Sequence, residues 1–279
     1  MLKALRVGTV LVFVITLILF CVFYTKEQNS QDNTIPSIEI PSGILDVSIQ
    51  DPQANLLTGI TAWDKKDGDI TSKIIIESIS KFSKDRTCIV TYAVMDSDKH
   101  VAKNSRTIRY TDYTAPEFYL EKPLIFRLDE SVDVRKMVGA KDCIEGDISE
   151  KVTIVATDYT DNTAGVFTLS LQATNKLGDV IFLDLPIYVE EINVRALAVE
   201  LREYLVYVEQ GEDIDFEEYI TSVSSNFVEI ENYDMLVSTN FDCNTPGTYS
   251  VHFNVEDSAG RTGHSVLTVV VRGDRFEQL

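Results

Sequence analysis

Alternating apolar and polar positions dominate the C-terminal part of the chain. In Gly247–Gly260 every second residue is apolar, namely Tyr249, Val251, Phe253 and Val255. This period of two places the apolar side chains on one face of a β-strand. Turn-forming residues follow at Asp257–Gly260, and Ser265–Val271 returns as a second apolar run. The pattern predicts a β-hairpin with one buried face.

The same hairpin pattern occurs twice more, beginning at Arg86 and at Gly165. When the three strands are aligned, Cys88 and Phe167 fall at the position of Tyr249. A repeated unit of this size indicates tandem domains with the same architecture. The third unit opens with a similar strand–turn–strand entry at Leu197–Val223.

An acidic turn precedes the hairpin in the first two units. The residues are Asp64, Asp67, Gly68 and Asp69 in the first unit, and Asp142, Glu145, Gly146 and Asp147 in the second. Carboxylates at alternate positions of a glycine turn are suited to Ca²⁺. Asp and Gly are equally favoured in turns for backbone reasons alone, and the loop lacks the twelve-residue frame of an EF-hand. We prefer the interpretation that these residues only form a tight turn, and the six carboxylates remain Ca²⁺ candidates.

The third unit has Ser224, Ser225 and Asn226 in place of the acidic turn, so any metal site built on that turn should be absent there.

Trp63, the only tryptophan, directly precedes the first acidic turn. We expect it to pack in a core rather than to form an exposed platform for a ligand. Pro186 lies in the last strand of the second unit and favours an edge position for that strand.

An apolar segment without charge or proline occupies residues 7–24. Its length is near the lower limit for a membrane-spanning helix. Lys3 and Arg6 precede it, and the positive-inside tendency places the N-terminus in the cytoplasm and the rest of the chain outside. A cleaved signal peptide and lipidation at Cys21 are the alternatives. Ile18–Tyr24 offers no small residues for a cleavage site, and the bulky Phe20 precedes Cys21 where a lipidated cysteine normally follows a small residue. A single-pass signal anchor is therefore predicted.

These patterns define a domain organisation with short joints between the units, which predicts a semi-rigid rod. The expected segments are a cytoplasmic tail (1–6), the anchor (7–24), a flexible stalk (25–34), three domains (35–112, 113–192 and 193–273) and a tail (274–279).

Composition narrows the function classes further. A formal charge of −19 disfavours a nucleic-acid partner, because phosphate binding requires clustered Lys and Arg. Four cysteines are present, of which Cys21 lies in the apolar segment and each predicted domain holds one, so no intradomain disulfide is expected. The three histidines, His100, His252 and His264, fall on a polar strand face or near hairpin turns. We find no convergent partners for them and predict no enzymatic activity and no cofactor.

The order of these features resembles the bacterial immunoglobulin-like domains of group 3, repeats found in surface proteins of Gram-positive bacteria. The matching residues are Ala62, Asp64, Asp67–Thr71 and Gly247–Arg261, and the likeness covers about residues 35–273. It implies a β-sandwich of the seven-strand class for each unit. It implies no activity, because the family is a scaffold.

The sequence therefore predicts an all-β chain of three tandem Ig-like β-sandwiches behind one N-terminal transmembrane helix. The expected function is cell-surface interaction, adhesion or spacing, with an unknown surface protein or glycan as partner. A Ca²⁺- or carbohydrate-binding module and an accessory subunit of a cell-envelope assembly are the alternatives. The loops Ser222–Asn226 and Asp257–Thr262 of the outermost domain are the predicted contact surface.

Overall fold

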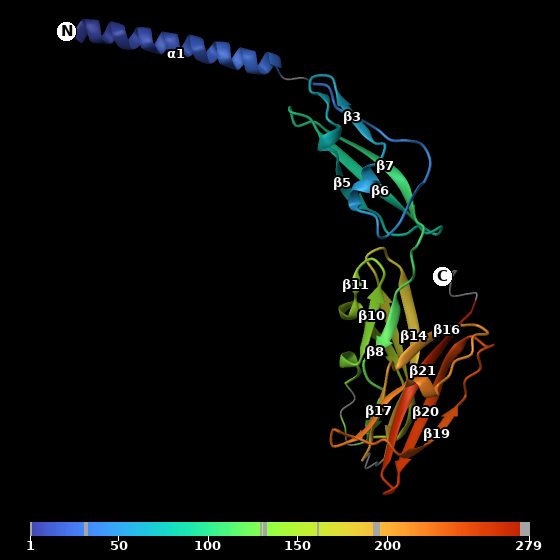
Figure 1. The fold of residues 1–279 in the computed structure, drawn as a ribbon. Helices are drawn as coiled ribbons and strands as arrows, with labels where there is room; N and C mark the ends of the chain where they lie inside the picture. The colour runs from blue at the N-terminus through green and yellow to red at the C-terminus, as the bar shows by residue number, and fades with distance from the viewer. Residues whose placement is uncertain are drawn as a thin grey trace. The chain divides into compact units, whose positions relative to one another are not determined.

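A computed structural model describes residues 2–30, 33–128, 130, 133–160, 162–191 and 196–273. The predicted C-terminal tail, 274–279, lies outside the described residues. The chain forms two compact units, Met1–Asp112 and Tyr113–Leu279. Within the described residues the fold is mostly β and consists of one apolar helix followed by three pairs of sheets, as predicted (Figure 1).

The N-terminal helix α1 runs from Leu2 to Ser30. Its segment Gly8–Thr25 has a mean hydropathy of 2.5, no residue of it is buried, and its length and composition suit a membrane span or a signal sequence. The prediction of a flexible stalk from residue 25 is wrong as far as Ser30, because helix continues through the polar segment. No Gly or Pro interrupts the sequence there, and Lys, Glu and Gln all favour helix.

The first sandwich (β1–β7) lies in unit 1 and pairs a three-stranded sheet, β1-β3-β4, with a four-stranded sheet, β2-β7-β6-β5. Its strands are β1 Ser37–Glu39, β2 Leu45–Val47, β3 Thr61–Asp64, β4 Gly68–Asp69, β5 Ile75–Ile79, β6 Thr87–Met95 and β7 Val101–Tyr110, with 3-10 turns at Gln53–Leu57 and Thr71–Lys73. The predicted hairpin is the β6–β7 pair, which is antiparallel from Thr87↔Arg109 to Met95↔Val101.

The second sandwich (β8–β14) repeats this arrangement with sheets β11-β10-β8 and β12-β13-β14-β9. Its strands are β8 Glu117–Leu120, β9 Ile125–Arg127, β10 Val138–Asp142, β11 Gly146–Asp147, β12 Thr153–Thr157, β13 Gly165–Thr174 and β14 Val180–Glu190, with 3-10 turns at Val134–Lys136 and Ser149–Lys151. Contrary to the prediction from Pro186, β14 is not an edge strand, because β9 pairs with its other side. That pairing covers only Tyr188–Glu190, so Pro186 interrupts no hydrogen bond to β9.

The third sandwich (β15–β21) has sheets β15-β17-β18 and β16-β21-β20-β19. Its strands are β15 Ala198–Leu201, β16 Leu205–Glu209, β17 Ile220–Ser225, β18 Val228–Glu229, β19 Tyr233–Thr239, β20 Gly247–Asp257 and β21 Thr262–Arg272, with a 3-10 turn at Glu217–Tyr219. The same strand order therefore occurs three times among the described residues.

The aligned hairpin positions form the sandwich cores as predicted. Cys88, Val90 and Tyr92 of β6 are buried, as are Leu169 and Leu171 of β13. Alternation along each strand turns these side chains toward the facing sheet.

The hairpin of the third sandwich differs from the prediction of one buried face. Every residue from Ser265 to Val271 in β21 is buried. One face of β21 packs in the core of its own sandwich, and Val270 on the other face joins the core cluster of the second sandwich. The continuous apolar sequence of β21 is typical of a strand that is covered on both sides.

The second and third sandwiches lie side by side within unit 2 (Figure 1). Leu205 and Val270 of the third sandwich belong to the core cluster of the second. The Tyr207 hydroxyl accepts a hydrogen bond from the Phe118 backbone N–H at 3.1 Å. The predicted rod, with units connected only by short joints, is therefore wrong for these two sandwiches. The apolar run in β21 is the sequence sign of this packing, but it does not identify which part of the chain covers the outer face of the strand.

Candidate functional site

The acidic turn of the first sandwich is held together by its own carboxylates. Asp64, which is only 2% exposed, accepts backbone N–H bonds from Lys66 and Asp67 on Oδ2 at 2.8 and 2.9 Å. Asp69 Oδ1 accepts the backbone N–H of Thr71 at 2.9 Å. Both side chains therefore satisfy backbone donors that the tight turn leaves without strand partners.

Asp67 connects this turn to the β6–β7 loop. Its carboxylate accepts the Ser97 backbone N–H at 2.7 Å and the Ser97 hydroxyl at 2.6 Å. The Lys73 ammonium lies 3.2 Å away. The hydroxyl of Ser97 is the main cause of a lowered pKa at Asp67, and Lys73 adds to it.

The second sandwich uses equivalent contacts. Asp142 Oδ1 accepts the N–H groups of Ile144 and Glu145 at 3.0 and 2.8 Å, and Asp147 Oδ1 accepts that of Ser149 at 2.9 Å. Asp142 Oδ2 accepts a further bond from the Asn175 side-chain amide at 2.9 Å. The two turns are therefore structurally the same, as the sequence repeat indicated.

The hydrogen bonds of each acidic turn do not bring the Ca²⁺ candidates of that turn to one point. Within the described residues no three His, Cys, Asp or Glu side chains are grouped so as to hold a metal ion. One feature distinguishes the first turn: Asp64 Oδ1 is buried and has no hydrogen-bond partner among the described residues, whereas Asp142 contacts Asn175. Calcium binding at these turns stays a prediction.

Trp63 is exposed, so the expectation that it packs in a core is wrong. The side chain is 61% exposed on β3, where Trp63 pairs with Ser37 on one side and Asp69 on the other. Its buried strand neighbours are Ala62 and Asp64, and alternation along the strand turns Trp63 outward. Gly68 lies beneath the indole, where an added Cβ would be 3.8 Å from the ring.

The two loops predicted as a contact surface lie together at one end of the third sandwich. Arg261 connects them, because its guanidinium donates to Ser225 Oγ at 3.1 Å and to Asp257 Oδ2 at 2.6 Å. Ser225 and Asp257 are buried beneath it. We call this surface, residues 222–228 with 257–262, the β17–β18 tip.

The sequence patterns did not identify the most exposed residue of the tip. Phe227 has an exposed fraction of 104%, and the next residue, Val228, is 65% exposed. Phe227 and Asn226 both have positive φ, 65° and 50°. A two-residue hairpin with positive φ at both positions is usually built from Asn-Gly, because residues with a Cβ are strained there. Asn226 between two strands is the sequence signal that could have located this turn.

Two histidines that the sequence treated as isolated surface residues come together between the second and third sandwiches. His252 on β20 and His264 on β21 stack with ring centroids 5.3 Å apart, and His252 Nδ1 lies 3.1 Å from His264 Nε2. The other imidazole nitrogen of His264, Nδ1, lies 2.8 Å from Glu190 Oε1 at the end of β14. Burial lowers the pKa of His252, the neighbouring His264 lowers it further, and Glu190 opposes both effects.

The geometry of this cluster is a chain and not a chelate. Glu190 and His252 contact opposite nitrogens of His264, so the three groups do not converge on one point. The third histidine, His100, contacts Asp96 in the first sandwich at 2.8 Å.

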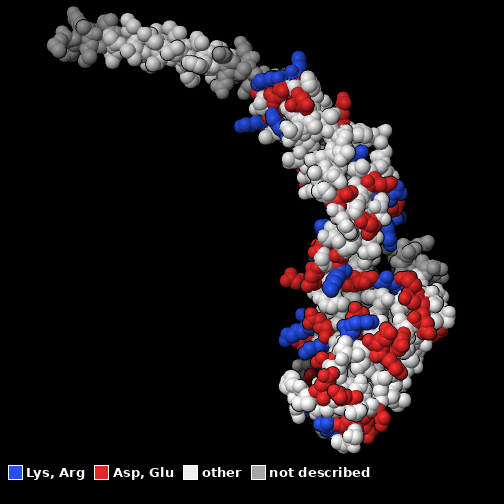
Figure 2. Space-filling model, viewed as in Figure 1, with Lys and Arg blue, Asp and Glu red and all other residues white. Residues whose placement is uncertain are grey.

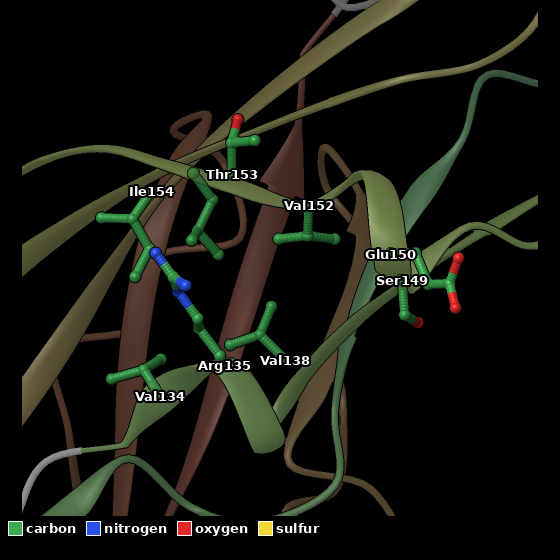
Figure 3. Close-up of a pocket in the computed structure, with 9 residues that line it drawn as sticks. Val134, Arg135, Val138, Ser149, Glu150, Val152, Thr153 and Ile154 are labelled. Carbon is green, nitrogen blue, oxygen red and sulfur yellow. The ribbon is translucent and has the colours of Figure 1, made fainter.

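A cavity of about 450 Å³ opens at the side of the second sandwich (Figure 3). Val134, Val138 and Val152 form apolar walls, and the Arg135 side chain extends across it toward Ile154. Its lining includes no His or Cys, and its only acidic residue is Glu150. The remaining polar residues of the lining are Arg135, Ser149 and Thr153.

The surface charge follows the composition. On the face drawn in Figure 2, Asp and Glu side chains cover much of the third sandwich, with few Lys or Arg between them.

All four cysteines, which lie in the described part of the chain, are free thiols. Cys88 is buried, as its alignment predicted, and burial raises the pKa of its thiol to about 11.

Comparisons with known proteins leave the family of this chain open. No protein-family model matches the chain. The pesticidal crystal protein Cry22Aa of Bacillus thuringiensis is 25% identical over 269 residues, which are 93% of this chain and 35% of that protein. The chain thus spans about a third of the length of this relative.

Two further similar proteins are found among solved structures. The CBM51-2 and INT domains of Clostridium perfringens ZmpB, solved in complex with GlcNAc, share 22% identity, with 53% of this chain and 26% of that chain covered and a TM-score of 0.22. Drosophila N-cadherin EC1-4 shares 14% identity, with 87% and 76% covered and a TM-score of 0.24. These neighbours are Ig-like, cadherin-like or carbohydrate-binding β-sandwich domains.

Proposed function

We propose that this chain is a non-enzymatic, membrane-anchored surface protein of the bacterial group 3 Ig-like type. Helix α1 crosses the membrane with its N-terminus in the cytoplasm, and the three sandwiches lie outside a Gram-positive cell. The β17–β18 tip contacts a partner protein on or near the cell surface. The exposed apolar segment of α1 and the repeated β-sandwiches support the anchor and the scaffold.

The observation that carries the proposed contact is Phe227. A fully exposed phenylalanine at a strained turn position is unfavourable for the isolated protein, since a glycine there would remove both the strain and the exposed apolar surface. Large aromatic side chains at the centre of an interface are frequent binding hot spots. The anionic surface of the third sandwich favours a basic rim on the partner.

The test replaces Phe227 with glycine in the full-length, membrane-inserted chain. A photo-reactive amino acid at position 228 should cross-link a specific protein on intact cells, and Phe227→Gly should weaken binding of that protein by at least about tenfold. Phe182→Ser is the matched control, because Phe182 is also an exposed phenylalanine (62%) but lies on β14. Equal binding by wild type and Phe227→Gly would contradict the placement.

The proposed topology has its own test. Whole cells that express the chain with a tag at each terminus are treated with a protease that cannot enter the cytoplasm. We expect the C-terminal tag to be lost and the N-terminal tag to be retained. A mature protein that lacks residues 1–30 would instead show that the apolar helix is a cleaved signal sequence.

Trp63 supports a second candidate function, carbohydrate binding by the first sandwich. Its exposed indole lies between Ser37 and Asp69, so a flat apolar surface has polar groups on both sides, as sugar rings require. Trp63→Ala should abolish binding to an array of cell-wall glycans, with Phe182→Ser as the control. Glycan binding that persists in Trp63→Ala would exclude this site.

A further inference from the structure

The contact between the second and third sandwiches contains the chain Glu190–His264–His252, which the proposed surface function does not use. We propose that this chain makes the contact sensitive to pH, so that the two sandwiches stay together at neutral pH and separate in mild acid. The inference concerns regulation within the molecule and does not depend on the identity of any partner.

The hydrogen-bond arrangement at neutral pH follows from the donor inventory of the three groups. The Glu190 carboxylate only accepts, so His264 Nδ1 carries a proton and donates across 2.8 Å. In neutral His264 the other nitrogen, Nε2, is then an acceptor, and His252 Nδ1 donates to it across 3.1 Å. With both histidines neutral, each contact has one donor and one acceptor.

One added proton can be accommodated in the closed contact, but two cannot. If His264 becomes an imidazolium, Glu190 compensates the charge, and His252 accepts from His264 Nε2 after changing tautomer. If both rings are protonated, His252 Nδ1–H and His264 Nε2–H point at each other across 3.1 Å. Two donors and two positive charges then oppose each other at a partly buried position.

Other titratable groups lie around the imidazoles. The Tyr188 ring meets His252 edge-on at 4.9 Å, and its hydroxyl donates to Ser250 Oγ at 2.7 Å. A cavity of about 460 Å³ beside His264 is lined by further charged residues of both sandwiches. Among the described residues, the titratable groups that contact the imidazoles or line this cavity are Glu121, Lys122, Tyr188 and Glu190 of the second sandwich, and Glu200 and Tyr204 of the third.

The direction of the pH effect follows from linkage. Burial and His264 lower the pKa of His252 in the closed state, whereas separation exposes the ring and restores its ordinary value near about 6.5. The separated state therefore binds more protons below that pH. The contact has its full stability above about pH 6.5. Below that pH, the equilibrium constant for closing the contact decreases by up to about tenfold for each pH unit.

The experiment uses native cysteines as reporters. Cys143 in the second sandwich is exposed and Cys243 in the third is partly exposed, whereas Cys88 is buried and stays unlabelled. Spin labels on Cys143 and Cys243 of the full-length Cys21→Ala chain in detergent report the distance between the two sandwiches. We expect one narrow distance distribution at pH 7.5, and a second, longer population that grows as the pH falls to 5.0.

Three variants determine whether the histidine chain causes the change. His252→Gln should keep the closed distance at pH 5.0, because the second protonation site is gone. Glu190→Gln should move the transition to higher pH, since it removes the carboxylate that compensates the first charge. His100→Gln, a histidine of the other compact unit, should leave the titration unchanged. A distance distribution of the wild-type chain that does not change between pH 7.5 and 5.0 would overturn the proposal, and so would an unaltered response in His252→Gln.

Discussion

At the scale of single residues, the acidic turns show how one side chain replaces several missing backbone partners. Asp142 is buried and accepts two backbone N–H groups of its own turn together with the amide of Asn175. Removing the carboxylate leaves three donors without an acceptor in a place that water enters poorly. Asp142 therefore stabilises the fold, whether or not the turn also binds a ligand.

We expect Asp142→Ala to lower the free energy of unfolding of unit 2 by about 2–4 kcal/mol, since each unsatisfied buried group is worth about 1–3 kcal/mol and part of the turn can relax. Urea denaturation of the full-length chain in detergent measures the change. Asp184→Ala is the control, because Asp184 is exposed on β14. A loss no larger than that of the control would contradict the structural role.

Asp67 predicts the behaviour of the first sandwich in acid. The Ser97 hydroxyl, followed by the Ser97 backbone N–H and then by Lys73, holds the pKa of Asp67 below the ordinary value of 3.8. A group with a lowered pKa in the folded state stabilises the fold above its unfolded pKa and loses that contribution as the pH falls through the folded value. The melting temperature of unit 1 should therefore fall more steeply below about pH 4 in the wild type than in Asp67→Asn. Parallel curves from pH 6 to 2 would show that the Ser97 contact adds nothing.

The same variant tests calcium. If Ca²⁺ binds the acidic turns, EDTA should lower the melting temperatures of unit 1 and unit 2, and Asp67→Asn should remove the effect in unit 1. The third sandwich lacks the carboxylates at this turn, so the response of unit 2 would come from the second sandwich. Identical melting curves with EDTA and with added Ca²⁺ would end the metal hypothesis.

At the scale of elements, the strands could be predicted from the sequence because alternation reports burial directly. The predicted and observed hairpins agree in all three sandwiches, and the acidic turns fall where the repeat placed them. Several errors concern what covers a face of a strand. His252 was correctly placed on the polar face of β20, but that face meets β14 rather than water. Trp63 was assigned to a core by its residue type, although its strand position turns it outward.

The β17–β18 hairpin gives a prediction at this scale that is separate from binding. Phe227→Gly places the preferred residue at the second turn position and should raise the free energy of unfolding of unit 2 by about 0.5–1 kcal/mol. Chemical denaturation measures the gain, with Val228→Thr as a control that reduces exposed apolar surface without changing the turn backbone. A loss of stability in Phe227→Gly would mean that the phenylalanine supports the fold, and its proposed role as a contact residue would lose its main argument.

At the scale of the whole molecule, three repeats do not amount to three independent domains. Sequence self-similarity indicates that the sandwiches fold alike, but contacts between them depend on outer faces that the repeat pattern does not specify. Leu205 and its neighbour Val206 show the difference. Leu205 packs in the core cluster of the second sandwich and Val206 in that of the third, so β16 contributes to two cores at once.

Shared packing of this kind couples unfolding. Calorimetry of the full-length chain in detergent at pH 7.5, where the contact is closed, should show one transition for unit 1 and one for unit 2, rather than one for each sandwich. Leu205→Ala removes a buried leucine from the second core and should destabilise unit 2 by about 2–5 kcal/mol, while the transition of unit 1 stays in place. The contrary result would be separate unfolding transitions for the second and third sandwiches, with only one of them shifted by Leu205→Ala. This result would show that the two sandwiches fold independently.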